Sequence, residues 1–471
     1  MNDFHTHNYP TAIAIFGGTG DLAQTKLLPA LFHLYIQKAL PDKFVVVGLS
    51  RKELSDTDYQ TYVKNTIVGD YNQSSKEIIN SFCGHFRYIS GSFDDSTSYE
   101  KIKGVLIAFD ESMGMCANKL FYLAVPPQYY DVIFENLYTS NVMSLCDGSW
   151  SRILVEKPFG RDLKTAVVLE EKLSALFAEE QIYRIDHYLA KDAIENIMSL
   201  RFLNSVVADS WHSKAIESIH IRLFEIKDVS NRGYFYDALG TLRDVGQNHI
   251  LQILALLTMN KANFADATDV RVARAAAIEM LSHHTISQLV RGQYVGYKET
   301  VGVSTDSETE TYFKITFDGA SPVWRGTEFI LEAGKALDSQ INEAVITFRP
   351  LSMCICGAEI GPHEHRNVLT IQFGPKQIIR LSMWMKQPGF GFTLQKEELI
   401  LVSTPVVDTY SPEAYERVFF DCIAGDQTRF VSGKEVAAAW QFITPILEQF
   451  ATLPMFEYEK GSIGPTNIYN N

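Results

Sequence analysis

One polar loop brings together four side chains that can bind an anion or move a proton. The segment QIYRIDHYLAKD, residues 181–192, places an acid, an imidazole, a phenol and an ammonium within six positions: Asp186, His187, Tyr188 and Lys191. An apolar strand end precedes this loop, and residues 191–202 carry apolar side chains at helical spacing. Unpaired amides, the positive end of a helix dipole and an ammonium together favour a phosphate ligand. Polar loops before helices are also common in proteins without a site there, so the loop alone leaves both interpretations open.

His249 is a candidate base within TLRDVGQNHILQILALL, residues 241–257, where it lies on the apolar face of a predicted helix. A lone histidine on such a face is more often a core residue, but Gly246, one turn earlier, is expected to leave room beside the imidazole. A buried base needs a carboxylate on its other ring nitrogen, to fix the tautomer and stabilise the imidazolium. Asp244 lies five residues away, roughly 140° around an ideal helix, and is expected to point elsewhere. Asp186 is therefore the predicted partner.

A glycine-rich turn follows the first apolar run of the chain. GGTGDLA, residues 17–23, comes directly after TAIAIF and before a helical pattern. Strand, glycine turn and helix are typical of a dinucleotide-binding crossover, in which the backbone approaches a pyrophosphate at the helix N-terminus. The spacing of Gly17, Gly20 and Ala23 matches the general G-x-G-x-x-G motif only in part, and a glycine turn after a strand is often just a turn.

Two basic residues follow the second apolar run, KFVVVG, and they bear on the choice of coenzyme. An acid near this point would bind the ribose 2′-hydroxyl of NAD, whereas a basic residue suits the 2′-phosphate of NADP. Arg51 and Lys52 therefore favour NADP, with NAD as the second choice. The alternative interpretation is two solvated charges after a strand.

The first part of the chain alternates strand-like runs with helical segments. These runs are residues 11–16, 43–48, 86–90, 119–125, 152–156 and 181–185. The alternation predicts an N-terminal Rossmann domain with a doubly wound parallel sheet over residues 1–186. Lys157-Pro158 ends the fifth run, at the carboxyl edge where ligands bind in such sheets. A proline there fixes the turn, is compatible with a cis peptide, and could direct Lys157 into the crevice.

The pattern changes after about residue 187. Residues 217–226 alternate apolar and other side chains, and comparable runs follow at 311–318, 327–333, 343–349, 367–373, 377–385 and 397–403. Many strands with short connections predict a large, mostly antiparallel sheet with one face covered by helices. The predicted helices include 241–259, 268–281 and 432–450. The fold class is therefore α/β plus α+β, with a C-terminal β+α domain over residues 187–471.

The composition excludes several partners. The net charge is −14, from 42 basic and 56 acidic residues, which argues against a nucleic acid or an anionic membrane surface. The six cysteines are scattered without a disulfide framework, which favours a reducing compartment. The N-terminus lacks a signal pattern and no apolar run reaches membrane-spanning length, so we expect a cytoplasmic protein.

Two further patterns are interpreted as decoys. Cys354, Cys356, His363 and His365 suggest zinc, but the pairs are too tightly spaced for the usual structural sites, so no metal is predicted. Tyr99 and Lys103 mimic the catalytic pair of short-chain dehydrogenases. They come before the fourth strand, too early for that role, and are interpreted as a solvated helix face.

Motifs along nearly the whole chain resemble the glucose-6-phosphate dehydrogenase family. In order, they are FGGTGDLAQTKLLP, VEKPFGRDL, RIDHYLAKD, LRDVGQNH, AGKAL, YERVFFDCIAGDQTRF, AAAW and GSIGP, of which RIDHYLAKD and GGTGDLA together are the most specific. The resemblance implies a Rossmann domain and a β+α domain that dimerises through the large sheet, giving a homodimer or a dimer of dimers. It also implies oxidation of glucose 6-phosphate at C1 to 6-phosphogluconolactone with NADP as hydride acceptor, the first step of the oxidative pentose phosphate pathway.

The resemblance also implies a role for each matched residue. His249 is the implied general base and Asp186 its carboxylate partner. The implied substrate residues are Lys157, His187, Tyr188, Lys191, Glu225, Asp244, Lys335 and Gln372. The implied coenzyme residues are Gly17, Gly18, Thr19, Gly20, Asp21, Leu22, Lys26, Arg51 and Lys157.

The chain departs from the family pattern in three places. Ala190 replaces the usual glycine of DHYLGK, Gln340 replaces a frequent Lys or Arg after AGKAL, and IKDVSNR after Glu225 lacks a glycine and a second glutamate. These changes leave the proton-transfer groups alone but affect the expected substrate affinity. Two alternatives therefore stay open: a dehydrogenase of the same fold for another hexose, and a catalytically silent NADP-binding regulator. The intact Asp186, His249 and Lys191 argue against the second.

Overall fold

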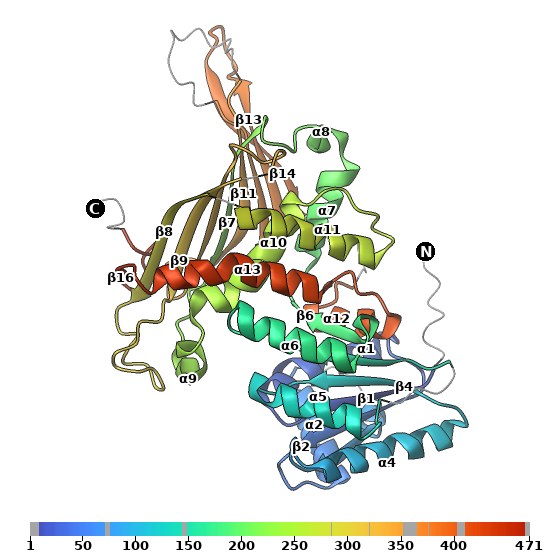
Figure 1. The fold of residues 1–471 in the computed structure, drawn as a ribbon. Coiled ribbons are helices and arrows are strands. Elements are labelled where there is room, and N and C mark those ends of the chain that lie inside the picture. The colour runs from blue at the N-terminus through green and yellow to red at the C-terminus, as the bar shows by residue number, and fades with distance from the viewer. Residues whose placement is uncertain are drawn as a thin grey trace.

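The computed structural model describes residues 9–70, 76–143, 148–283, 285–319, 321–351, 365–374, 376–402 and 410–466. Two sheets with their helices lie end to end, the first built mainly from the N-terminal part of the chain (Figure 1). No described helix is both long enough and apolar enough to cross a membrane.

The first sheet has seven strands in the order β15-β6-β5-β4-β1-β2-β3. Their bounds are β1 Thr11–Phe16, β2 Phe44–Ser50, β3 Phe86–Ser90, β4 Asn118–Leu123, β5 Ser151–Val155, β6 Ile182–Ile185 and β15 Phe430–Val431. The pairings among β1 to β6 are all parallel, which confirms the predicted Rossmann sheet. Strands such as β1 are buried along their whole length, as expected for a sheet covered on both faces.

Helices lie on both faces of this sheet. Their bounds are α1 Leu28–Ile36, α2 Asp56–Asp70, α3 Lys76–Cys83, α4 Ser96–Met113, α5 Tyr130–Thr139 and α6 Leu163–Leu176. The expectation of a solvated face at Tyr99 and Lys103 on α4 is wrong. Tyr99 is fully buried and its hydroxyl donates to the carbonyl of Phe93, while Lys103 donates to the carbonyl of Ser140. The pair is therefore structural.

The second sheet has nine strands in the order β14-β13-β12-β11-β7-β10-β9-β8-β16. Their bounds are β7 Ile216–Phe224, β8 Thr285–Tyr294, β9 Tyr312–Asp318, β10 Glu328–Gly334, β11 Ile341–Phe348, β12 Val368–Gly374, β13 Ile378–Lys386, β14 Leu394–Val402 and β16 Met455–Tyr458. Most pairings are antiparallel, as predicted, but β10 runs parallel to β7 and β16 parallel to β8. Strands β8 and β16 were not among the predicted strands.

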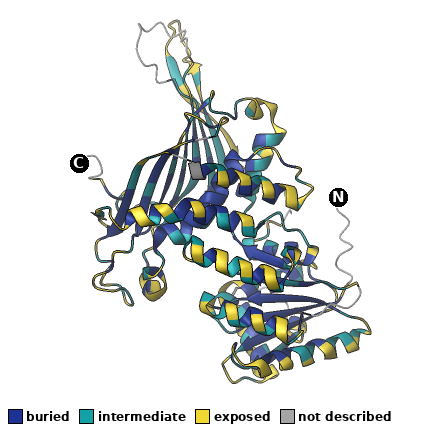
Figure 2. Cartoon of the chain, in the orientation of Figure 1, coloured by how far each residue is buried: buried dark blue, intermediate teal, exposed yellow. Residues whose placement is uncertain are grey.

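One face of the second sheet is covered by helices α10 Leu251–Thr258, α11 Ala267–Glu279 and α13 Gly433–Phe450 (Figure 1). Helix α10 is buried along its whole length, whereas α11 and α13 each have a buried side and an exposed side (Figure 2). This part also contains α7 Asp192–Leu203, α8 Ser205–Ala208, α9 Gly233–Asp237, the short 3-10 helices η5 Ser230–Arg232 and η7 Met280–His283, and a π-helix, η6 Leu242–Ile250, that leads directly into α10.

The chain returns to the first sheet near its C-terminal end. Helix α12, Ala414–Ala424, packs on α1, and β15 pairs antiparallel with β6. The core below the first sheet accordingly includes Val418, Phe419 and Cys422 of α12. The division into residues 1–186 and 187–471 stays a proposal, with this C-terminal excursion added to the first part.

The cysteines differ from the expectation. Cys83 and Cys422 are free and buried, but Cys116 is disulfide-bonded. The bond at Cys116 departs from the prediction of cysteines without a disulfide framework, and the reducing compartment stays a prediction. Three residues of the zinc decoy, Cys354, Cys356 and His363, lie outside the described residues, so that prediction is not tested.

Candidate active site

A cavity of about 920 Å³ lies where the carboxyl edge of the first sheet meets the second part of the chain. The first part contributes Asp21, Leu22 and Lys26 from within and just before a π-helical segment, η2 Ala23–Leu27, that leads into α1, and Glu156 and Lys157 from the end of β5. The other walls are formed by the loop after β6, by η6 and by the segment before α12. Ligands of doubly wound folds bind at this edge.

The glycine turn comes directly before the lining residues Asp21 and Leu22 and is closely packed. Gly17 has φ +87°, and a Cβ there would lie 2.3 Å from the carbonyl oxygen of Ala124. A Cβ on Gly18 would lie 2.9 Å from the Tyr59 hydroxyl, whereas one on Gly20 would meet only backbone oxygens, the nearer at 3.1 Å. The turn therefore needs glycine at positions 17 and 18 for its own close packing.

The remaining predicted coenzyme residues divide between the cavity and the surface. Asp21, Leu22 and Lys26 line the cavity, and the Thr19 hydroxyl lies 2.7 Å from that of Ser50. Arg51 is exposed after β2 and lies outside the lining of the cavity. A basic group free to face solvent at this position fits a 2′-phosphate.

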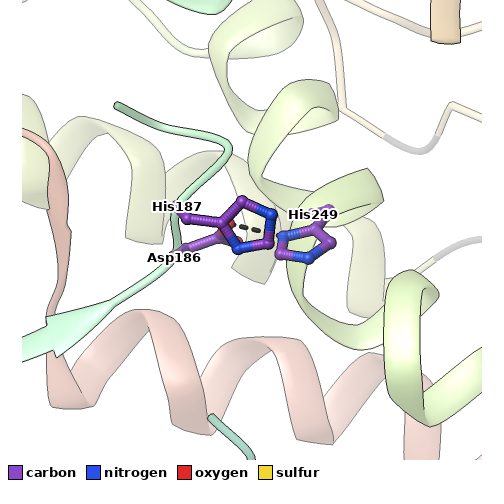
Figure 3. A group of neighbouring side chains, drawn as sticks. All are labelled: Asp186, His187 and His249. Atoms are coloured by element: carbon purple, nitrogen blue, oxygen red, sulfur yellow. Dashed lines mark hydrogen bonds and ion pairs between the residues drawn. The ribbon is translucent and has the colours of Figure 1, made fainter. Parts of the chain in front are cut away.

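His249 and Asp186 form the buried centre of the site (Figure 3). Each is 2% exposed, and Nδ1 of His249 lies 2.5 Å from Oδ1 of Asp186, which also accepts the backbone N–H of Tyr188 at 3.0 Å. Burial by itself would raise the pKa of Asp186, but the adjacent His249 outweighs burial and lowers it to about 2. Burial lowers the pKa of His249, against the opposing effect of Asp186. The pair is therefore a carboxylate and a neutral imidazole, with Nε2 as the proton acceptor.

The π-helical geometry of η6 corrects two expectations about His249. An i to i+5 hydrogen-bond pattern brings residues five apart onto one side of the helix. Asp244 therefore lines the same cavity as His249 and interacts with it electrostatically, so the expectation that it points elsewhere is wrong. A Cβ on Gly246 would meet Leu242 at 2.7 Å and Phe313 at 3.0 Å. Gly246 therefore allows close packing in the core, and it does not leave space beside the imidazole.

Aromatic rings hold the base and the loop residues together. The Tyr188 ring stacks on His249 with centroids 4.1 Å apart, and His187 meets His249 edge-on at 4.8 Å. Nζ of Lys191 lies 3.6 Å from the centroid of the Tyr188 ring. Burial lowers the pKa of His187 well below its usual value and also lowers that of Lys191. The predicted loop residues thus gather around the base.

A chain of alternating charges forms the opposite wall. Lys157 follows β5 just before a cis peptide to Pro158, and its ammonium donates to the Asp244 carbonyl at 2.6 Å and to Oδ1 at 3.2 Å. Nζ of Lys335 lies 2.9 Å from Oε1 of Glu225 and 3.8 Å from Oδ2 of Asp244. Burial would raise the pKa of Asp244, but the two ammoniums outweigh it and hold the pKa far below its usual range. Charged hydrogen-bonding groups of this kind can bind sugar hydroxyls.

Gln372 is not among the residues that line the cavity, and its role at the substrate stays a prediction. Its Oε1 accepts from Arg380 at 3.1 Å, and among the described residues the cavity is lined by Gln377 instead. Ala190 is buried and lines the cavity, whereas Gln340 is exposed and lies outside the lining. Of the two substitutions, only Ala190 belongs to the cavity lining.

Sequence reasoning missed two parts of the cavity wall. The Glu156 carboxylate accepts from the Tyr122 hydroxyl at 2.6 Å and is hydrogen-bonded to Tyr415. Tyr415 belongs to residues 411–415, which line the cavity from the start of α12. An acid next to Lys157 at a strand end, and the quoted motif YERVFFDCIAGDQTRF, were the available signals.

The spacing of Asp186, His187 and His249 would also suit a metal ion, because their ligand atoms lie within 4.8 Å of one another. Oδ1 of Asp186 and Nδ1 of His249 are already joined by a hydrogen bond, which favours an acid–base role. The absence of a metal stays a prediction.

Comparisons with known proteins agree with this geometry. Two family models match: the NAD binding domain of glucose-6-phosphate dehydrogenase over residues 14–196, and the C-terminal domain over residues 198–470. A glucose-6-phosphate 1-dehydrogenase of Chlamydia pneumoniae is 35% identical, over 97% of this chain and 93% of its own. The cytoplasmic glucose-6-phosphate 1-dehydrogenase 6 of Arabidopsis thaliana is 33% identical, over 96% of this chain and 89% of its own.

Solved structures give the same result. A glucose-6-phosphate dehydrogenase in complex with its substrate glucose-6-phosphate is 31% identical, with a TM-score of 0.88 over 98% of this chain and 96% of its own. A glucose-6-phosphate 1-dehydrogenase from Mycobacterium avium is 29% identical, with a TM-score of 0.83 over 97% of this chain and 95% of its own. The resemblance seen in the motifs is thereby confirmed, and the chain belongs to the glucose-6-phosphate dehydrogenase family.

Proposed function

We propose that this protein oxidises glucose 6-phosphate at C1 to 6-phosphogluconolactone by hydride transfer to NADP. The observation that carries the proposal is the buried hydrogen bond between Asp186 and Nδ1 of His249. It fixes a neutral imidazole with Nε2 as acceptor, beside a loop suited to a phosphate. Family membership supports the same activity.

The residues on the sugar side divide the work of binding and proton transfer. Lys191, His187 and Tyr188 would bind the substrate phosphate, while Lys335 and Glu225 would contact the sugar. His249 would then take the C1 hydroxyl proton at Nε2. The Asp186 carboxylate would stabilise the resulting imidazolium, and burial of both groups strengthens that interaction.

The turn at the other end of the cavity fits a dinucleotide. Gly17 and Gly18 allow a tight turn directly before a helix, and Lys26 and Lys157 supply positive charge in the cavity. When bound, the nicotinamide ring would supply the hydride acceptor. Arg51 supports NADP as the preferred coenzyme and leaves NAD as the second choice.

A coenzyme-by-sugar activity matrix tests the proposal. Purified protein given glucose 6-phosphate and NADP should produce the absorbance of reduced nicotinamide. Galactose 6-phosphate and unphosphorylated glucose test the alternative of another hexose. Folded protein that binds NADP in calorimetry but shows no turnover at high substrate would support the silent regulator instead.

We also propose a homodimer, or a dimer of dimers, joined through the second sheet. The edge strand β14 and its neighbour β13 protrude from the molecule (Figure 1). Exposed apolar side chains lie on them: Met383, Met385, Leu399, Ile400, Leu401 and Val402. An exposed apolar edge of this length favours pairing with another chain. Light scattering after gel filtration should give at least twice the monomer mass of 53.1 kDa.

We propose the cytoplasm as the location of this protein, in agreement with the name of the cytoplasmic Arabidopsis relative. The proposed pathway is the oxidative pentose phosphate pathway, because its first step is the proposed reaction. Cell fractionation would test the location.

A further inference from the structure

The helix that follows the phosphate loop begins with two carboxylates. Asp192 and Glu195 lie in the first turn of α7, directly after Lys191, and Asp192 lines the cavity. The helix dipole stabilises acids at this position. The same negative charges oppose the binding of a phosphate dianion at the same helix end.

Two arginines from the C-terminal part of the chain pair with these carboxylates. The Arg417 guanidinium of α12 forms an ion pair with Oδ1 of Asp192, and its Nη1 lies 3.4 Å from Oε2 of Glu195. Nη2 of Arg429 lies 2.8 Å from Oε1 of Glu195. Arg417 is only 15% exposed in its side chain, so solvent screens its charge less than that of a surface residue.

The second oxygen of Asp192 is also bound from the C-terminal side. The Ser411 hydroxyl donates to Oδ2 at 3.0 Å. Neither Arg417 nor Arg429 lines the cavity, so neither can touch the substrate. Any effect of these arginines on the substrate must therefore act through Asp192 and Glu195.

We propose that Arg417, supported by Arg429, is a positioning residue for phosphate recognition, because it neutralises the carboxylates at the start of α7 and orients Asp192. This inference rests on the proposed function. Removal of Arg417 would leave Asp192 and part of the Glu195 charge to repel the sugar phosphate, without altering the His249–Asp186 pair. Phosphate binding should weaken while proton transfer is kept.

The test compares Arg417→Met with the wild-type protein. Methionine keeps much of the apolar stem and removes the charge. We expect KM for glucose 6-phosphate to rise about tenfold, as for unit charges several ångströms apart in partly screened surroundings, with kcat within about twofold. The ratio of the variant KM to the wild-type KM should decrease at high salt concentration, because salt screens the charges. Arg87→Met is the matched control, because Arg87 pairs with Asp56 at 3.7 Å on β3, at the opposite edge of the first sheet.

Two further variants separate charge from structure. Arg417→Lys keeps the charge and should recover most of the affinity. The double variant Arg417→Met, Asp192→Asn removes both the guanidinium charge and the Asp192 carboxylate charge. It should also recover most of the affinity. If the double variant, shown to be folded, binds no better than Arg417→Met, the arginine has only a structural role and the inference is wrong.

A readout that does not need turnover separates this inference from the proposed function. Inorganic phosphate, titrated calorimetrically into wild-type protein and Arg417→Met, should bind the variant about tenfold more weakly. Equal phosphate affinities would overturn the inference even if the wild-type protein oxidises glucose 6-phosphate. A wild-type protein without turnover that still shows the difference would count against the proposed function alone.

Discussion

The two ends of the cavity are built in opposite ways. At the sugar end, His249 and Asp186 are almost completely buried, and each is held by hydrogen bonds or stacked rings from other elements. At the coenzyme end, the glycine turn packs against the Ala124 backbone and the Tyr59 side chain, and Arg51 lies exposed to solvent. Proton transfer depends on distances that burial fixes, whereas the choice of coenzyme depends on a charge that an incoming phosphate can reach.

This contrast predicts how much each region tolerates change. A substitution among the buried, interlinked groups alters several interactions together, and leaves charges or polar atoms unpaired in a low-dielectric environment. A substitution at the exposed end removes one partly solvated contact. The expected effects therefore fall from the sugar end to the coenzyme end.

His249→Asn should have the largest effect. Asparagine keeps one hydrogen bond to Asp186 but cannot accept the proton, so kcat should fall by about four orders of magnitude. Calorimetry should show nearly unchanged binding of glucose 6-phosphate. A variant that keeps a tenth of the wild-type rate would remove His249 from the role of base.

Asp186→Asn should lower kcat/KM by about a hundredfold and shift its pH profile. Only the neutral imidazole accepts a proton, so activity rises with pH through the pKa of His249, which burial places below its usual 6.5. Because the Asp186 carboxylate raises that pKa, its removal should move the acid limb to lower pH. An acid limb that moves to higher pH, measured in the same buffers, would contradict the assigned pairing.

Arg51→Ala should act only on coenzyme affinity. We expect KM for NADP to rise about tenfold, with KM for NAD and kcat nearly unchanged, because only NADP carries the 2′-phosphate. Initial rates with both coenzymes at saturating sugar would measure this. An equal loss for both coenzymes would show that Arg51 supports the fold of the turn instead.

Ala190→Gly should have the smallest effect. Ala190 lines the cavity with one methyl group, and its removal should change KM for glucose 6-phosphate by less than about threefold. Gln340→Lys is the matched control at the other departure from the family pattern, and it should leave KM unchanged because Gln340 lies outside the lining. A larger effect at Gln340 would indicate that this residue reaches the ligand in the bound state.

Much of this arrangement followed from local patterns. The first six strands of the Rossmann sheet lie within two residues of their predicted bounds, because buried parallel strands form short apolar runs between turn signals. The partner of His249 followed from chemistry, since a buried base needs a carboxylate. The structure confirms that Asp186 fills this position.

The missed features depend on information that local patterns lack. A π-helix does not follow the 3.6-residue period, so its effect on Asp244 could not be read from helical spacing. Strand β15 has two residues, too few for an alternation of apolar and polar side chains to be recognised. The Tyr99 side chain is polar at one atom only, and its burial depends on packing against the distant Phe16 ring, with centroids 5.8 Å apart, and on the carbonyl of Phe93 six residues earlier.

The late return of the chain to the first sheet affects how the protein folds during synthesis. Strand β6 is paired on its outer side only after β15, residues 430–431, has been synthesised. Helix α12 is synthesised just before β15. An N-terminal piece released early from the ribosome would carry an open sheet edge and an uncovered apolar surface on α1, both prone to aggregation. The two halves are therefore expected to mature together, and an excised coenzyme-binding half should be poorly soluble.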